Sequence, residues 1–169
     1  MVDVGESFDV DVVVSGLDAA GEIVSAFDLD VLYDASVLSA TDVQFTGNLG
    51  IVDFDTITEV NFFSGVVDFL EINIFLTDAE LAILQPGDSV TLATLSFSAL
   101  TDGVSSLMFG PDPNTGNNVV GSLFSSLQLS AIEQAQVTVL AQIPEPGTFF
   151  LILGGLLLAG MKKRTQIKI

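Results

Sequence analysis

The sequence predicts an all-β protein: a two-sheet sandwich of nine short antiparallel strands with one short helix, followed by a single hydrophobic helix at the C-terminus. Three observations predict this class. Apolar and polar residues alternate in short runs over most of residues 4–141, turn-forming residues separate those runs, and an uncharged apolar stretch fills residues 149–161. A hydrophobic fraction of 49% and 13 Phe residues are sufficient to fill a core.

The alternation is clearest in two runs near the N-terminus. In residues 27–33, Phe27, Leu29 and Val31 share one face while Asp28 and Asp30 share the other, and residues 8–15 alternate in the same way. A period of two is typical of a half-buried strand, so Leu29 and Val31 are predicted core positions. Further strands are predicted at residues 43–46, 58–63, 66–76, 90–99, 106–109, 119–124 and 135–140.

One interruption of this pattern predicts a short helix across one end of the sandwich. Thr77 and Glu80 have the spacing of a capping box, in which each side chain accepts a hydrogen bond from a backbone N–H of the first turn. Leu81 and Ile83 continue the helix, and Pro86 ends it.

The charge is strongly one-sided. Residues 1–143 hold 21 acidic residues and no basic residue, because all four bases lie in the last eight residues. Nucleic-acid affinity comes mainly from Lys and Arg, so nucleic acid is excluded as a partner, and anionic lipid headgroups are repelled for the same reason. Solubility and repulsion between copies explain the acidity more simply than cation binding does.

The residue types present argue against an enzyme. Cys and His are both absent, which excludes Ser-His-Asp and Cys-His nucleophile systems and Cys-based zinc sites. Two carboxylate pairs, Asp9 with Asp11 and Asp28 with Asp30, could suggest glycoside hydrolysis. Both pairs are predicted on strand faces opposite the core, where exposure to solvent explains them, and no Trp is present to stack on a sugar. No catalytic residue is assigned.

Residues 112–116 place oxygen-bearing side chains at alternate positions, like the start of a calcium loop. Such a loop, counted from Asp112, needs an acidic residue at its twelfth position, where Leu123 stands. Turn chemistry therefore explains the segment better. No metal ligand or cofactor is assigned, and calcium remains an alternative.

The Phe-rich stretches at residues 62–63 and 69–75 also admit two interpretations. They could form an exposed binding surface, or they could fill the core. In a sandwich without Trp, Phe is the main large side chain available for packing, so the core is favoured.

The C-terminal tail has three parts in order. Pro144, Glu145 and Pro146 form a stiff break, residues 149–161 are uncharged and apolar, and Lys162, Lys163 and Arg164 follow at once. The predicted organisation is a sandwich over residues 1–141, a linker over residues 142–148, a short transmembrane helix over residues 149–161 and a basic cytoplasmic tail over residues 162–169. A helix this short barely spans a bilayer core of about 30 Å.

This arrangement resembles the PEP-CTERM sorting signal of Gram-negative bacteria, with Pro144, Glu145 and Pro146 as the motif and Lys162, Lys163 and Arg164 as the basic stop. The resemblance implies processing by an exosortase, transient residence in the inner membrane, and final export to the cell surface or the extracellular matrix. A plain tail anchor is the alternative.

The opening of the chain suggests a further expectation. Residues 1–4 lead directly into strand sequence, without the basic and apolar segments of a signal peptide. An exported protein needs such a segment, so the true N-terminus is expected to lie upstream.

The body of the chain resembles a cohesin-type domain. Residues 4–14 are similar to that family's first full strand, residues 26–38 to its second, and residues 87–97 to a later strand, although the family usually has Pro where Ala35 stands. The resemblance implies a nine-stranded jelly-roll sandwich, and it implies that the strand preceding residue 4 in the family is missing here.

Two functions follow. The first is a structural or adhesive, non-catalytic component of the cell surface or of an exopolysaccharide (biofilm) matrix. The second is a specific binding module that recognises a dockerin-type protein partner or a carbohydrate, an analogy that depends on the fold.

Overall fold

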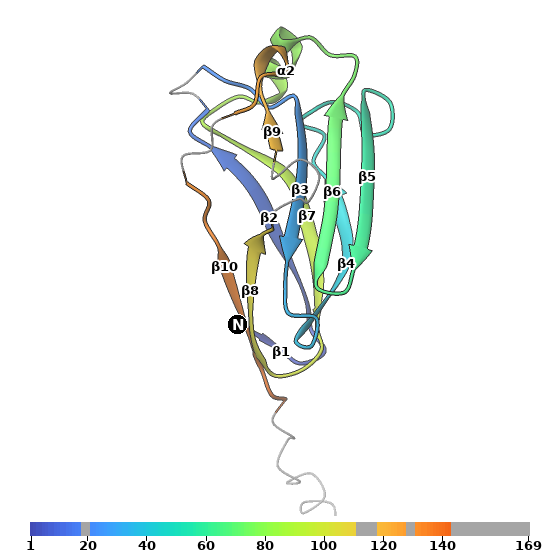
Figure 1. Ribbon diagram of the computed structural model, residues 1–169, viewed down its shortest axis with the longest axis vertical. Coiled ribbons are helices and arrows are strands. Elements are labelled where there is room, and N and C mark those ends of the chain that lie inside the picture. The colour runs from blue at the N-terminus through green and yellow to red at the C-terminus, as the bar shows by residue number, and fades with distance from the viewer. Residues whose placement is uncertain (18–20, 111–117, 128–130, 143–169) are drawn as a thin grey trace, which may run out of the picture.

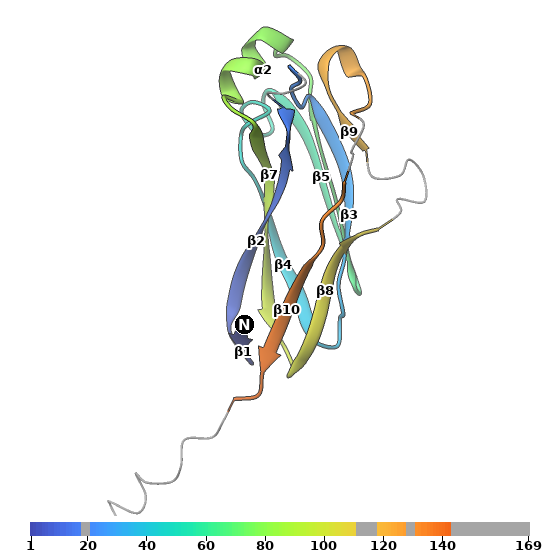
Figure 2. The same ribbon diagram turned by 90° about the vertical axis from the view of Figure 1, so that its left-hand side faces the viewer.

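The computed structural model describes residues 1–17, 21–110, 118–127 and 131–142. In this part of the chain two β-sheets pack face to face, and a short helix closes one end (Figure 1). Figure 2 shows the two layers edge-on, with the C-terminal end of β10 at the end of the sandwich opposite the helix. The predicted two-sheet sandwich is confirmed.

Ten strands and two short helices make up the described part of the chain. In the first half they are β1 (Val2–Asp3), β2 (Ser7–Ser15), β3 (Ala26–Leu32), β4 (Leu38–Phe45), β5 (Thr56–Phe63) and β6 (Val66–Asn73). In the second half they are α2 (Asp78–Leu84), β7 (Ser89–Ala99), β8 (Gly103–Phe109), β9 (Asn118–Val120), the 3-10 helix η1 (Ser122–Phe124) and β10 (Ala135–Leu140).

The larger sheet has the strand order β1-β10-β8-β3-β6-β5, and β9 also pairs with β3. The smaller sheet has the order β2-β7-β4. Except for the parallel pairing of β1 with β10, neighbouring strands run antiparallel. Strand β1 is a two-residue addition to the strands predicted from the sequence.

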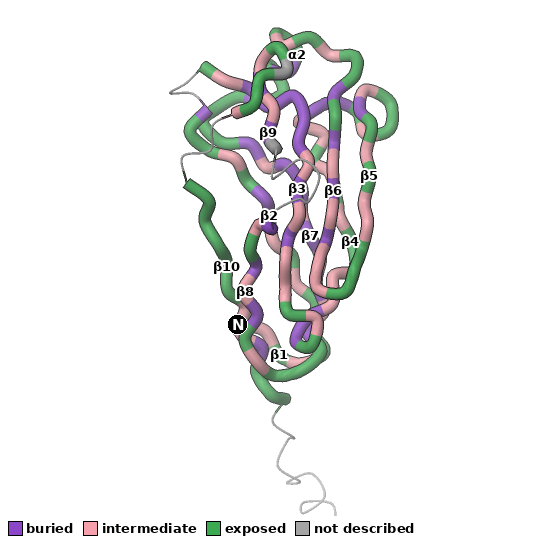
Figure 3. Tube along the Cα trace, viewed as in Figure 1, coloured by how far each residue is buried: buried purple, intermediate pink, exposed green. Residues whose placement is uncertain are grey.

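The core lies between the sheets and is built from the inward positions of each alternating strand (Figure 3). Leu29 and Val31 are buried, as predicted. Phe27, Phe69 and Phe97 are the largest fully buried side chains, and the rings of Phe27 and Phe69 meet edge to face with centroids 6.0 Å apart. Aromatic pairing of this kind adds to the stabilisation from apolar burial.

The predicted helix and its cap are confirmed. Glu80 N–H donates to Thr77 Oγ1 at 3.4 Å, and Thr77 N–H donates to Glu80 Oε2 at 2.8 Å, so both halves of the capping box are present. Leu81 is the buried residue of this helix. At its C-terminal end, the Gln85 side chain donates to Val24 O at 2.7 Å and accepts from Val24 N–H at 2.8 Å, which ties the helix to the chain just before β3.

Four strand boundaries differ from the prediction by three residues or more. Strand β4 begins at Leu38 and β8 at Gly103, each earlier than expected. The strand predicted at residues 119–124 ends at Val120, and η1 follows, with Leu123 in the left-handed conformation at φ 53°. The strand predicted at residues 66–76 ends at Asn73, whose side chain bonds Leu76 N–H and Leu76 O and so forms a turn.

The predicted C-terminal helix at residues 149–161 lies outside the described residues, as do the proposed sorting motif at Pro144, Glu145 and Pro146 and the basic residues Lys162, Lys163 and Arg164. In the part of the chain that the structure describes, no helix is both long enough and apolar enough to cross a membrane.

Candidate functional site

The outer face of the larger sheet carries an unusual number of apolar side chains. Strand register places Ile57 of β5 opposite Ile72 of β6, and Phe63 opposite Val66. On β8, Met108 and Val104 have the same outward orientation. Ile57 is 54% exposed and Phe63 59%. No helix or further sheet of the described residues covers this face (Figure 2). An uncovered apolar surface of this kind is typical of an interaction site.

Acidic and amide side chains are interspersed among these apolar residues. Asn61 Nδ2 donates to Glu59 Oε1 at 2.9 Å and to Asp68 Oδ2 at 3.2 Å, across the β5–β6 pair. Asp28 and Asp30, on the neighbouring strand β3, also have the outward parity and are half-buried. No basic residue exists in residues 1–143 to neutralise this face. It is therefore both apolar and negatively charged.

The outer face of the smaller sheet is of a different kind. Ser96 Oγ donates to Asp9 Oδ1 and Thr94 Oγ1 donates to Asp11 Oδ1, both at 2.7 Å across the β2–β7 pair. Most outward positions here are Ser, Thr, Asp or Gln, and Val13 is an apolar exception at 50% exposure. Hydroxyl groups thus satisfy the carboxylates, and the face is well solvated.

The two outer faces hold both carboxylate pairs that the sequence analysis considered for glycoside hydrolysis. Asp9 and Asp11 lie on the smaller sheet and Asp28 and Asp30 on the larger, and all four face away from the core, as predicted. Across residues 1–17, 21–110, 118–127 and 131–142, no group of three or more acidic residues could hold a metal ion. The calcium-like segment at residues 112–116 falls outside that part of the chain.

The prediction that the Phe-rich stretches fill the core is wrong for three residues. Phe69 is fully buried, but Phe62, Phe63 and Phe75 are 47%, 59% and 68% exposed. For Phe62 and Phe63 the physical reason is the position of β5, which is the edge strand of the larger sheet, so no neighbouring strand covers its outer side and its last residues stand in solvent. Phe75 lies in the loop between β6 and α2, outside both sheets.

Glu71 is a buried acid that the sequence analysis did not single out. It has the inward parity of Val67 and Phe69 on β6, it is fully buried, and neither carboxylate oxygen has a hydrogen-bond partner. Burial raises the pKa of Glu71 to about 7. The Thr56 hydroxyl is close enough to lower this pKa somewhat, although it does not reach full hydrogen-bond geometry, and the Asp53 carboxylate raises it further.

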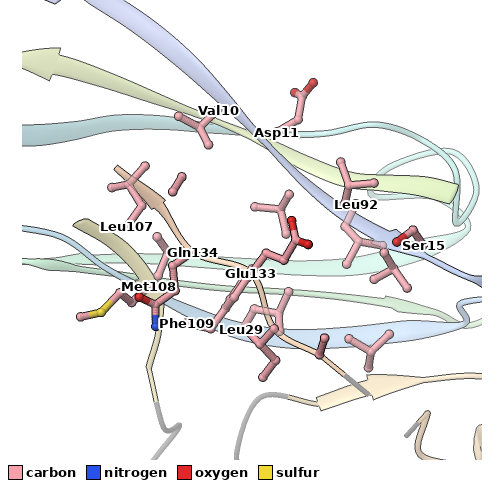
Figure 4. Close-up of a pocket in the computed structure, with 18 of the residues that line it drawn as sticks. Val10, Asp11, Ser15, Leu29, Leu92, Leu107, Met108, Phe109, Glu133 and Gln134 are labelled. Atoms are coloured by element: carbon pink, nitrogen blue, oxygen red, sulfur yellow. The ribbon is translucent and has the colours of Figure 1, made fainter. Parts of the chain in front are cut away.

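A cleft of about 600 Å³ opens between β2 and the segment leading into β10 (Figure 4). Val10, Leu29 and Leu107, from the two sheets, line its interior. The polar side chains Glu133 and Gln134 are exposed. Core side chains thus form an apolar interior, and the polar part of the lining comes from Asp11, Ser15, Glu22, Glu133 and Gln134.

Comparison with known proteins identifies solved structures that share this fold. No protein-family model and no curated protein sequence matches this chain. Solved structures do match. A type II cohesin dyad from the ScaA scaffoldin of Acetivibrio cellulolyticus superposes with a TM-score of 0.64 at 19% identity. The match covers 80% of this chain and 44% of that one, so the chain spans less than half of the dyad.

Two single-domain matches cover both partners more evenly. A type II cohesin domain from the Acetivibrio cellulolyticus cellulosome gives a TM-score of 0.62 at 20% identity over 80% of this chain and 88% of that one. A type I cohesin–dockerin complex of Clostridium thermocellum gives 0.59 at 11% identity over 82% and 92%. The fold is a cohesin-like β-sandwich. At these identities the likeness concerns the fold alone.

Proposed function

We propose that this cohesin-like sandwich is a non-catalytic binding module that captures a dockerin-type protein partner through the outer face of its larger sheet. The observation that carries the proposal is the contrast between the two outer faces. Ile57, Phe63 and Met108 stand exposed on the larger sheet, whereas hydroxyl groups and hydrogen-bonded carboxylates cover the smaller one. Solved structures of the same fold that include a type I cohesin–dockerin complex support a protein partner.

Charge restricts the chemistry of that partner. Glu59 and Asp68 lie among the apolar residues of the face, and the domain has no base with which to pair them. A partner that brought further carboxylates would be repelled, whereas Lys and Arg at the rim of its contact surface would be attracted. The partner is therefore expected to offer apolar side chains surrounded by basic ones, and its association rate should fall as salt is added.

The experiment that tests the proposal uses two valines of almost equal exposure on opposite faces. Val104, on the larger sheet, is 51% exposed, and Val13, on the smaller sheet, is 50% exposed. The full chain is immobilised and presented with the extracellular fraction of the source organism. We expect one stoichiometric protein to be retained by the parent and by Val13→Asp, and retained poorly by Val104→Asp and Phe63→Asp.

The affinity lost at Phe63 should be about tenfold or more, because replacing an aromatic hot-spot residue costs about 2 kcal/mol or more, roughly thirtyfold. Equal retention by all four proteins would refute the assignment to this face. Diffuse association with many components and no stoichiometric protein would instead favour a structural role in the matrix.

The tail supports a second proposal, that the protein is exported and sorted. Its basis is the sequence order of Pro144, Glu145 and Pro146, the apolar stretch at residues 149–161, and the cluster Lys162, Lys163 and Arg164. The order resembles a PEP-CTERM signal, which implies an exosortase as the processing partner and the cell surface or extracellular matrix as the destination.

Replacing Pro144, Glu145 and Pro146 by Ala tests this in the full chain, expressed behind a signal peptide. The substituted protein should stay uncleaved in the inner membrane while the parent reaches the surface. If surface display is equal for the two proteins, a plain tail anchor explains the segment better.

A further inference from the structure

The end of the sandwich that holds α2 exposes a dense group of apolar side chains. Ile51 and Phe54 of the β4–β5 loop are each 67% exposed, Phe75 before α2 is 68% exposed, and Ile83 of α2 is 77% exposed. The rings of Phe54 and Phe75 lie against each other with centroids 6.4 Å apart. This end lies opposite the point from which the chain beyond β10 departs (Figure 1). We call this group the α2 end.

A groove runs through the α2 end, between the helix and the β4–β5 loop. Its apolar walls come from both sides, and Gly47 and Gly50 lie along the loop side. Phe45, Ile51, Val52, Leu76, Ile83 and Leu84 supply these walls. Leu81 packs the other side of α2 into the sandwich, and the groove residues Ile51, Ile83 and Leu84 are left exposed.

The two walls are held in place by hydrogen bonds. Asp55 N–H donates to Ile51 O at 2.7 Å, and the Asp55 carboxylate accepts from Ile51 N–H at 2.9 Å, which closes the loop. Gln85 anchors the end of α2 through Val24 and also donates to Asn48 O at 3.1 Å. A groove fixed in this way loses little conformational entropy when a partner binds.

The surroundings of the groove are acidic. Asp55 lines the groove from the β4–β5 loop, and Glu80 lines it from α2. Hydrogen bonds from the Thr77 backbone and hydroxyl hold the pKa of Glu80 below its usual value, so this carboxylate stays charged. Because residues 1–143 contain no base, neither a second copy of the domain nor an anionic membrane offers complementary charge.

We propose that the α2 end is a second docking surface, and that its occupant is a cationic amphipathic helix of a protein partner. An amphipathic helix fits a groove with two apolar walls by inserting residues spaced at i, i+3, i+4 and i+7. Lys or Arg on the flanks of that helix would meet Asp55 and Glu80, which both line the groove. The surface is distinct from the sheet face around Phe63 and Met108, so one module could contact a partner at both places.

The test uses the full chain and a fluorescent peptide of about 18 residues, with Leu at the i, i+3, i+4 and i+7 positions and Lys elsewhere. The control peptide has the same composition with Leu and Lys rearranged so that no apolar helical face remains. Fluorescence anisotropy measures both affinities. We expect the amphipathic peptide to bind at least about tenfold more tightly than its control.

Variants then locate the binding. Ile83→Asp and Phe75→Asp should each weaken the amphipathic peptide by about tenfold. Leu100→Asp, at a residue 49% exposed beyond the opposite end of β7, should leave it unchanged. All three positions are exposed, so unfolding should not intervene, and circular dichroism melts check this.

Two results would overturn the proposal. The first is equal binding of the two peptides, which would reduce the effect to general attraction by the acidic surface. The second is self-association of the full chain that Ile83→Asp disperses and that the peptide does not compete with, because a second copy would then be the occupant.

Discussion

The two sheets follow the same rule on their inner sides and different rules on their outer sides. Inward positions on both are apolar and meet in one core. Outward, the smaller sheet pairs Asp9 with Ser96 and Asp11 with Thr94, whereas the larger sheet leaves Ile57 and Phe63 exposed. The fold requires only the inward rule. The outward difference therefore carries information about function, because exposed Ile and Phe side chains do not contribute their burial to the stability of the isolated domain.

The largest effect should come from breaking the inward rule itself. Leu29→Asp places a carboxylate in the core beside the apolar side chains of Phe27 and Phe69. An unpaired buried charge costs several kcal/mol, comparable with the roughly 5–15 kcal/mol stability of a whole domain, so the protein should unfold. Ile57→Asp makes a similar apolar-to-acid change on the outward side and should leave the fold intact. Far-ultraviolet circular dichroism distinguishes the two, and loss of strand signal in both would erase the inside–outside contrast.

The second effect concerns Glu71, the one acid on an inward position of the larger sheet that is fully buried. Its pKa is about 7 in the folded protein, against an ordinary value of 4.5, so the folded state holds its proton more tightly than the unfolded state. The contribution of this group to stability is then fully present below about pH 4.5 and is lost as the pH rises through 7. The loss is about 3 kcal/mol from linkage of the two pKa values.

The measurement compares the parent with Glu71→Gln in urea melts from pH 5 to pH 8. The difference isolates Glu71 from the other carboxylates, which titrate in both proteins. We expect the free energy of unfolding of the variant, relative to that of the parent, to increase as the pH rises, so that the variant is the more stable of the two at pH 8. A constant difference across this range would mean that Glu71 keeps an ordinary pKa.

Strands β3, β6 and β5 show how much of the burial pattern could be predicted from the sequence. Alternation correctly placed Leu29 and Val31 of β3 inside. The same alternation of Val67 and Phe69 on β6 also places Glu71 inside, although charged side chains are usually exposed. The exposure of Phe62 and Phe63 had no comparable signal. It depends on β5 being the sheet edge, and strand order is set by long-range pairing that a local pattern does not encode.

The dependence on long-range contacts also explains why the sequence did not predict the groove beside α2. The capping box of Thr77 and Glu80 predicted where α2 begins, because a cap is a local interaction. The groove beside α2 needs the β4–β5 loop, which is distant in sequence and held there by Gln85 and Asp55. Charge composition, in contrast, could be read directly and already argued against nucleic acid as a partner.

A third, smaller effect should come from screening the acidic surface. Both outer faces carry carboxylates and neither carries a base, so like charges repel across each of them. Salt screens this repulsion over a Debye length of about 8 Å at physiological ionic strength. Adding NaCl should raise Tm by a few degrees, equivalent to about 1 kcal/mol. CaCl₂ at matched ionic strength should do no more, unless the segment at residues 112–116 binds calcium, in which case it would raise Tm further by mass action.

The smallest effect should come from the polar face of the smaller sheet. Ser96→Ala removes the hydroxyl that donates to Asp9 at 2.7 Å, and Thr94→Val removes the one that donates to Asp11. Both bonds lie at the surface, where water replaces the lost donor, so each change should cost only about 0.5 kcal/mol in urea melts. Neither should alter retention of a partner that binds the larger sheet, and Val13→Asp serves as the matched reference on the same face. A loss of partner binding comparable to that of Phe63→Asp would reverse the comparison between the two faces, because the hydrogen-bonded ladder of Asp9, Asp11, Thr94 and Ser96 would then be the recognition surface.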